Sequence, residues 1–133
     1  MTDPLDQQIR EWQTAEQQAA DGELRMDEGI GEALRAACEA YRDRLVQLQH
    51  DALGLQTLSG YGGIPSAQIL RAKFQNKAVH GDSDDSTDSA FTRLGQHIEI
   101  ATLMRDTYAA TIGKVGTVDQ QNAVELRAKG GQL

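Results

Sequence analysis

The side chains with the most potential for chemistry form an acidic run between two apolar segments. Carboxylates and hydroxyls alternate along it, in Asp82-Ser83-Asp84-Asp85-Ser86-Thr87-Asp88. Such oxygens suit calcium, but an EF-hand loop that begins at Asp82 requires glycine at its sixth position and glutamate at its twelfth. Thr87 and Arg93 stand there instead. We therefore expect a solvated loop in which Asp85 or Ser86 caps the helix that follows.

The nitrogen and sulfur ligands of the chain do not form a metal-binding pattern. The three histidines, His50, His80 and His97, have no zinc-ligand spacing among themselves or with the single cysteine, Cys38. A lone cysteine cannot form an intramolecular disulfide, and in an apolar helical pattern it is typical of a small buried side chain. The sequence predicts no metal and no other cofactor.

A nucleophilic site is not indicated either. Ser66 lies in Gly63-Ile64-Pro65-Ser66-Ala67, which lacks the glycine that follows the serine in a nucleophile elbow. The same serine suits a helix N-cap. The sequence also has no Walker A motif, no dinucleotide-binding glycine pattern and no Cys-x-x-Cys pair. These observations favour a protein that is not an enzyme.

Five segments have the apolar spacing of helices. They are a peripheral helix at 4–20, two long helices at 27–57 and 87–112, a short inserted helix at 67–78 and a weak C-terminal helix at 117–128. Matched apolar stripes on the two long helices predict that these helices pack antiparallel. The sequence therefore predicts one all-α domain, 1–133, built as a long antiparallel helical hairpin with additional short helices in a bundle-like arrangement.

The apolar stripes predict which side chains face inward. On 27–57 the stripe follows steps of three and four residues through Met26, Ile30, Leu34, Cys38, Tyr41, Leu45, Leu48, Ala52 and Leu55, with Asp27 as the cap. On 87–112 only Arg105 interrupts the stripe. In the short helix, Ile69, Leu70, Phe74 and Ala78 are expected to face inward, and Arg71, Lys73 and Lys77 outward. Trp12 is expected to bring the 4–20 helix onto the chain's own hairpin, with docking on a partner as the alternative.

Charge and composition limit the partners. The 133 residues carry a net charge of −7, and residues 1–43 hold eleven acidic and four basic residues, so this segment accounts for the whole excess. Nucleic acid and anionic membrane surfaces are poor partners for such a chain, because both attract a surplus of Lys and Arg. No apolar run approaches the ~20 residues of a membrane span, so membrane insertion is not expected.

Residues 1–25 contain no apolar core of a signal peptide. We therefore expect the protein to be cytoplasmic as synthesised, and any export to use a route without a Sec signal.

An aromatic-x-Gly turn between long helices, in a small acidic chain, resembles the Trp-x-Gly superfamily of type VII (ESX) secretion proteins. Tyr61-Gly62-Gly63 forms the turn motif, with tyrosine in place of the tryptophan. The run from Gly60 through Pro65 to Ala78 and the run from His97 to Tyr108 look like divergent actinobacterial members of that group. The resemblance lies within 26–112 and implies a helical hairpin that pairs with another helical protein.

The chain departs from this family in two respects. The helix at 67–78 is additional to a minimal hairpin. The export signal Tyr-x-x-x-Asp/Glu is not met, because Ile112 stands four residues after Tyr108. Since the signal is carried by only one member of a pair, its absence implies a helper chain or cognate partner of an exported protein, or a resident adaptor.

A second apolar stripe supplies the predicted partner-binding face. Its members are Val46, Leu53, Leu58, Leu103 and Met104. Either the helices of a partner bury this face, in a hetero- or homodimer, or the helices at 4–20 and 67–78 cover it within a monomer. The first case predicts a protein–protein interaction component associated with type VII secretion. The alternative is a self-contained regulatory or small-ligand-binding bundle, with Cys38, Tyr41 and His50 lining a cavity.

Overall fold

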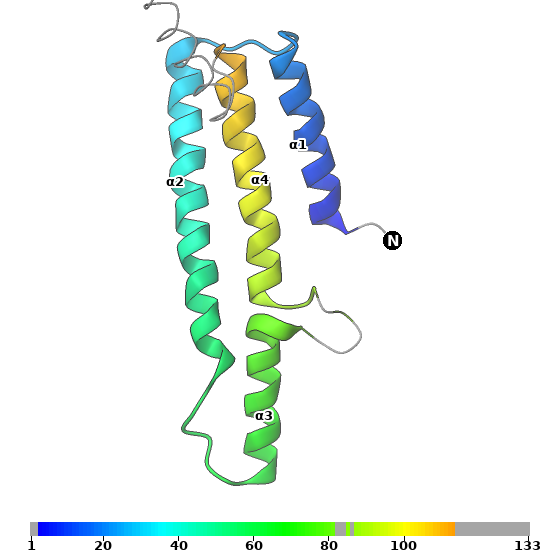
Figure 1. The fold of residues 1–133 in the computed structure, drawn as a ribbon, viewed down its shortest axis with the longest axis vertical. Coiled ribbons are helices and arrows are strands. Elements are labelled where there is room, and N and C mark those ends of the chain that lie inside the picture. Colours follow the sequence, from blue (N-terminus) through cyan, green and yellow to red (C-terminus); the bar gives the residue numbers. More distant parts are fainter. Residues whose placement is uncertain (1–2, 82–84, 86, 114–133) are drawn as a thin grey trace, which may run out of the picture. The chain divides into compact units, whose positions relative to one another are not determined.

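The computed structural model describes residues 3–81, 85 and 87–113. Among these residues it contains helices and no strand, which confirms the all-α class (Figure 1). The elements in chain order are α1 (Pro4–Ala20), α2 (Glu28–Leu53), the 3₁₀-helix η1 (Gly54–Gln56), α3 (Pro65–Gln75), the π-helix η2 (Asn76–His80) and α4 (Ala90–Thr111). The expected helix at 117–128 lies outside the described residues. None of the described helices is both long and apolar enough to cross a membrane.

Local capping chemistry explains where the first two α-helices begin. Asp3 accepts a hydrogen bond from the amide of Leu5 at 3.0 Å, and Pro4 occupies the first helical position, where a missing N–H costs nothing. Asp27 caps α2 as expected, because its Oδ2 accepts from the Ile30 amide at 3.2 Å.

The two later α-helices begin at other residues than expected. Helix α3 starts at Pro65 after an extended Ile64, so Ser66 lies inside its first turn and is not the cap. For α4, Ser89 is the cap, and its Oγ accepts from the Thr92 amide at 3.1 Å. Asp85 does not cap α4; its Oδ1 instead accepts from the Thr87 amide at 2.9 Å. Ser86 lies outside the described residues.

Helix α2 buries a narrower stripe than the sequence predicts. Its buried positions, Gly31, Cys38, Leu45 and Ala52, follow one another at intervals of seven residues. The expected stripe members Ile30, Tyr41, Leu48 and Leu55 are exposed. A seven-residue interval is typical of a narrow seam between long helices, and three of its four residues here are small. Leu34 is half-buried, and the other large apolar side chains of α2 outside this seam are exposed.

The chain divides into two compact units, and the first comprises Met1–Ala40 with Ile100–Leu133. Within this unit α2 and α4 run antiparallel, because Gly31 lies against Ile112 and Glu39 pairs with Arg105 further along. The buried side chains of the unit are mostly small, namely Ala19, Cys38, Ile100, Ala101, Thr107, Ala109 and Thr111. Small side chains let helix backbones approach closely.

Helix α1 belongs to the same unit, where its Trp12 packs edge-on against Tyr108 of α4. The ring centroids are 6.1 Å apart and the ring planes are inclined by 65°. This geometry is favoured by the aromatic quadrupoles. Trp12 thus contacts its own chain, as expected.

The second unit, Tyr41–Glu99, holds the end of α2, η1, α3, η2 and the start of α4. Gln49 of α2 donates its amide to the carbonyl oxygen of Phe91 on α4 at 3.1 Å. The buried apolar side chains of the unit are few: Leu45, Ala52 and Ala78. Several larger apolar side chains of this unit are therefore left at its surface.

Candidate interaction surface

The turn motif is fastened to the helix that follows it. Gly60 and Gly62 have φ angles of 89° and 74°, a region that residues with a Cβ rarely adopt. The side-chain amide of Gln68 donates to the carbonyl oxygen of Gly62. The ring of Tyr61 lies 6.5 Å, centroid to centroid, from that of Phe74. Tyr61-Gly62-Gly63 and α3 therefore form one local structure.

The structure distributes the predicted partner-binding face over both units. Val46 and Leu53 of α2 are exposed, and Leu58 after η1 is half-buried, all within the second unit. Leu103 and Met104 are half-buried on α4 in the first unit. The exposed part of this face is therefore the end of α2, where Leu48 is exposed as well, and Leu55 of the adjoining η1 is also exposed.

Helix α3 presents its apolar side chains to solvent, contrary to the orientation expected from the sequence. The exposed fractions are 60% for Ile69, 47% for Leu70 and 50% for Phe74, and Ile64 just before the helix is 66% exposed. On the other side of the helix, Gln68, Arg71 and Gln75 are half-buried. Of the inward set only Ala78 is buried.

The inward side of α3 also contains a buried polar group without a hydrogen-bond partner. The Nε of Arg71 is buried and has no hydrogen-bond partner among the residues that the structure describes. A buried polar N–H without a partner is costly, and so is an exposed row of large apolar side chains. Both features accompany the same orientation of α3, in which the apolar side faces solvent. Sequence periodicity identifies the apolar side of a helix but not whether that side faces the core or the solvent. The periodicity of α3 therefore did not predict this surface.

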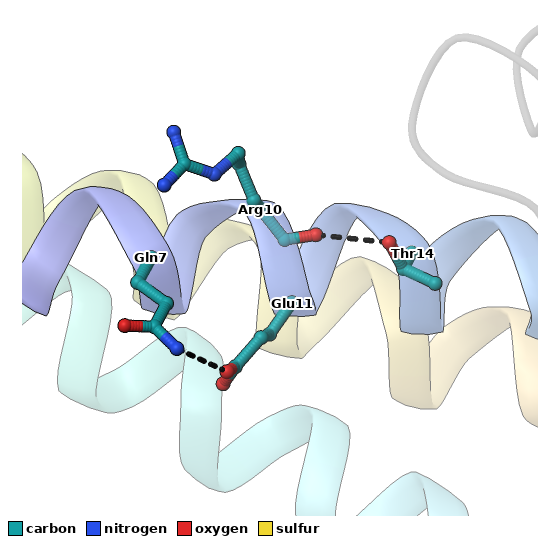
Figure 2. Close-up of a pocket in the computed structure, with 4 residues that line it drawn as sticks. All are labelled: Gln7, Arg10, Glu11 and Thr14. Atoms are coloured by element: carbon teal, nitrogen blue, oxygen red, sulfur yellow. Dashed lines mark hydrogen bonds between the residues drawn. The ribbon is translucent and has the colours of Figure 1, made fainter. Parts of the chain in front are cut away.

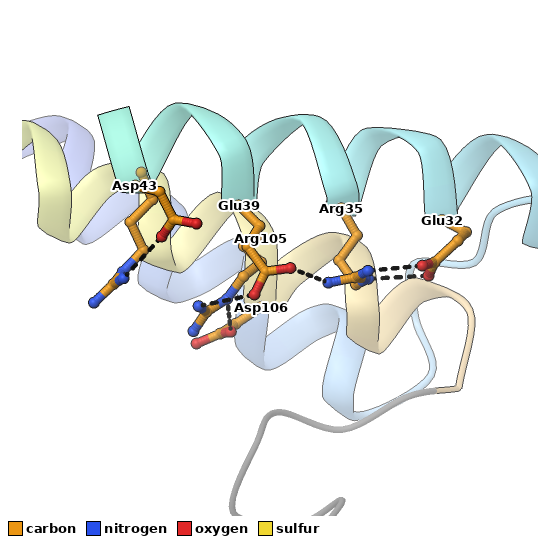
Figure 3. A network of polar contacts seen from close by, with 7 residues as sticks. Glu32, Arg35, Glu39, Asp43, Arg105 and Asp106 are labelled. Carbon is orange, nitrogen blue, oxygen red and sulfur yellow. Dashed lines mark hydrogen bonds and ion pairs between the residues drawn. The ribbon is translucent and has the colours of Figure 1, made fainter. Parts of the chain in front are cut away.

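An ion-pair network accounts for the arginine that interrupts the stripe of α4. Arg105 faces Glu39 of α2 at 4.0 Å and pairs with Asp106 through Nε at 3.0 Å (Figure 3). Arg35 reaches both oxygens of Glu32, at 2.7 and 3.0 Å, and Glu39 at 2.9 Å. Hydrogen bonds to Glu32 and then Glu39 raise the pKa of Arg35 above its ordinary value. The network links two helices of the first unit, and each of these charged side chains has a partner of opposite charge.

A carboxylate lies beside this network on α1. Burial, and secondarily the charge of Asp106, raise the pKa of Glu16 above its ordinary value of 4.5. The folded state therefore favours protonated Glu16, and its contribution to stability is present below about pH 4.5 and lost as the pH rises through the folded pKa.

We expect Glu16→Gln to stabilise the protein at neutral pH, by less than about 1 kcal/mol because solvent screens a partly exposed carboxylate. The gain should disappear below about pH 4.5, where the wild-type side chain is neutral as well. Urea unfolding from pH 3.5 to 7.5 measures this difference. Glu23→Gln, which removes the same charge from an exposed turn position, is the control. Equal gains for both variants at neutral pH would contradict the assignment to Glu16.

The residues considered for a cavity belong to both units of the chain. Cys38 is buried in the first unit, and burial raises the pKa of its thiol, so it has the character of a packing residue. Tyr41 and His50, its proposed neighbours in a cavity, are exposed residues of the second unit. Among the described residues there is no cluster of His, Cys, Asp or Glu that could hold a metal ion. Residues 82–84 and 86 of the acidic run lie outside the described residues.

A surface hollow of about 500 Å³ lies along α1, and its described lining consists of Gln7, Arg10, Glu11 and Thr14 (Figure 2). Gln7 donates to Glu11 at 3.3 Å, and the Thr14 hydroxyl donates to the carbonyl oxygen of Arg10 at 3.1 Å. All four residues are exposed and come from one helix. This lining has neither the apolar walls nor the converging polar groups of a ligand site.

No family model, no curated protein and no solved structure matches this chain.

Proposed function

We propose that this protein is a non-enzymatic interaction protein that binds a helical segment of another protein. The observation that supports this proposal most is the orientation of α3, whose large apolar side chains point to solvent while Arg71 points inward. Exposed apolar side chains at the end of α2 extend the same kind of surface within the second unit. In helix-in-groove recognition, an amphipathic helix places apolar anchor residues, three and four positions apart, against an apolar surface.

The biological setting that we propose is type VII secretion, in which the protein is a helical partner or adaptor of a secreted protein. The support for this setting is the sequence resemblance around Tyr61-Gly62-Gly63. The lack of an acidic residue four positions after Tyr108 fits the member of a pair that does not carry the export signal. Under this proposal the protein acts by burying apolar surface of its partner, and it requires no cofactor.

Replacing Leu53 with aspartate should weaken partner binding at least about tenfold, because burial of a charge opposite an apolar surface is costly. The free energy of unfolding should change little, since Leu53 is exposed in the free protein. Co-expression with each short helical protein encoded beside this one, followed by light scattering and titration calorimetry, measures complex formation and affinity.

Two further variants complete this experiment. Gln47→Asp introduces the same charge on the exposed surface of α2 and should leave the affinity unchanged. Met104→Asp should instead lower the stability, because Met104 is half-buried in the free protein. If no adjacent helical protein forms a complex, the setting in secretion is wrong. If a complex forms and Leu53→Asp binds as wild type, this part of the predicted face is wrong.

A further inference from the structure

Within the second unit, an exposed row of apolar side chains follows α2 and the adjoining η1 beside the buried row. Leu45 and Ala52 form the buried row. Tyr41, Leu48 and Leu55 are 49%, 37% and 50% exposed, and the two leucines each come three residues after a buried position. Apolar positions in steps of three and four are typical of a coiled coil, in which both rows are buried between helices. Among the described residues only the first row is covered.

Two residues of opposite charge lie on the same side of the helix, one before and one after Leu48. Arg44 is four residues before it and Asp51 three residues after it, so both adjoin Leu48 on the helix surface. Both are exposed, and neither has an ion-pair partner among the described residues, although Asp51 accepts a hydrogen bond from Gln47 at 2.9 Å. We call Tyr41, Arg44, Leu48, Asp51 and Leu55 the α2 stripe.

The charges of the α2 stripe are complementary to the same stripe in the reverse direction. If a second copy runs antiparallel and meets the first at Leu48, Arg44 of each copy lies opposite Asp51 of the other. A parallel copy would place like charges opposite each other, which opposes association. Arg42 and Asp43 do not disturb this pattern. They pair with each other at 3.5 Å and lie at least about 120° around the helix from Leu48.

From these observations we propose that the α2 stripe is the contact between two copies of this chain, paired antiparallel about a two-fold axis at Leu48. A two-fold axis uses the same surface on both copies, so each contact occurs twice. Tyr41 of one copy would cover Leu55 of the other, and Arg44 would pair with Asp51 on either side of the axis. A different protein would need this order of charges, whereas a second copy already has it.

The inference goes beyond the proposed function, because it concerns another side of the helix. Leu53 of the predicted partner-binding face lies about 140° around α2 from Leu48. Self-pairing therefore leaves Leu53 available to a partner. The α2 stripe extends over only about four helical turns, so the dimer belongs to the small, weak class of interfaces.

Sedimentation equilibrium of the full-length protein at low salt measures this association. Over protein concentrations from about 1 μM to 1 mM, we expect a reversible equilibrium between monomer and dimer. A higher salt concentration should weaken the dimer, because salt screens exposed ion pairs.

Reversal of single charges tests the antiparallel contact. Arg44→Asp and, separately, Asp51→Arg should each weaken the dimer at least about tenfold, because like charges would then face each other twice. An equimolar mixture of these two variants should regain the wild-type affinity, since every pair across the contact is again of opposite charge. Misfolding of a variant does not produce such a recovery. Asp43→Arg makes the same charge reversal on another side of α2 and should leave the dimer unchanged.

The centre of the contact is tested by Leu48→Asp, which should weaken the dimer by about a hundredfold because two aspartates would meet at the axis. The free energy of unfolding of the monomer should change little, since Leu48 is exposed. Leu53→Asp makes the same replacement on the other side of α2, so the dimer should persist in that variant.

Several outcomes would overturn the inference. These are a wild-type protein that stays monomeric over the whole range, a dimer that both charge reversals leave unchanged, and a mixture of the two variants that does not recover. A dimer that dissociates in Leu53→Asp but not in Leu48→Asp would place the contact on the other side of α2. In each of these cases, a complex with an adjacent helical protein that Leu53→Asp weakens would still support the proposed function.

Discussion

Replacing Gly31 with alanine should lower the free energy of unfolding by about 2–3 kcal/mol, the range of a severe overpacking substitution. A Cβ at position 31 would lie 2.3 Å from Cγ2 of Ile112 and 3.6 Å from the Thr111 hydroxyl oxygen. The Cγ2 methyl of isoleucine is attached to the branched carbon next to the backbone, so it cannot swing aside as the end of a long side chain can. One of the two helices would have to move, and urea unfolding would record the loss.

Gly29 supplies a matched control two residues earlier in the same helical turn. It is exposed, and the nearest atom to a Cβ there is Oδ2 of Asp27 at 3.3 Å. That oxygen also accepts the capping hydrogen bond from the Ile30 amide, but the 3.3 Å contact requires it to shift by only a few tenths of an ångström, so the cap can persist. Gly29→Ala should therefore range from neutral to a gain of about 1 kcal/mol, the helix propensity of alanine over glycine. Similar losses in both variants would show that the contact with Ile112 is not what limits position 31.

Replacing Trp12 with alanine should lower the free energy of unfolding by about 2–3 kcal/mol, because a half-buried indole loses its packing and its ring contact. Trp12 reaches Tyr108 from a helix whose other covered apolar residues are Leu5, Ile9, Ala15 and Ala19, so the indole is the largest apolar side chain that packs from α1. We therefore expect faster amide hydrogen exchange throughout 4–20 in this variant. Gln13→Ala, at the exposed neighbouring position, should leave exchange in α1 unchanged.

The ring contact itself is measured by a double-mutant cycle with Tyr108→Ala. The coupling energy between the two rings should be about 0.5–1.5 kcal/mol, as for other edge-to-face pairs. A coupling energy near zero together with unchanged exchange in α1 would mean that this helix is not held by Trp12.

Local sequence signals determined the positions of the first two α-helices. Helix α1 spans Pro4–Ala20, the same residues as the predicted segment, because a proline opens it and Asp21-Gly22 ends it. The predicted range 27–57 is filled by α2 and η1, and the glycines and proline that follow end that helical run. Periodicity and helix breakers act between residues that are close together in the chain, so they can be recognised in a single sequence.

Other features depend on which segments pack against each helix. Only the tertiary structure decides these features. The sequence identifies Gly31 as a weak helix former, whereas the structure shows the Ile112 side chain that requires a glycine there. Arg105 interrupts an apolar stripe, and Glu39 from α2 faces it in addition to its sequence neighbour Asp106.

Helix α3 illustrates the same difference most clearly. Its amphipathic spacing is local, but the direction of its apolar side is set by the neighbours that it packs against. A sequence taken alone assumes that apolar side chains turn inward, because the free energy of burial favours it. In the second unit of this protein they turn outward, and for that reason α3 is the element to which we assign partner binding.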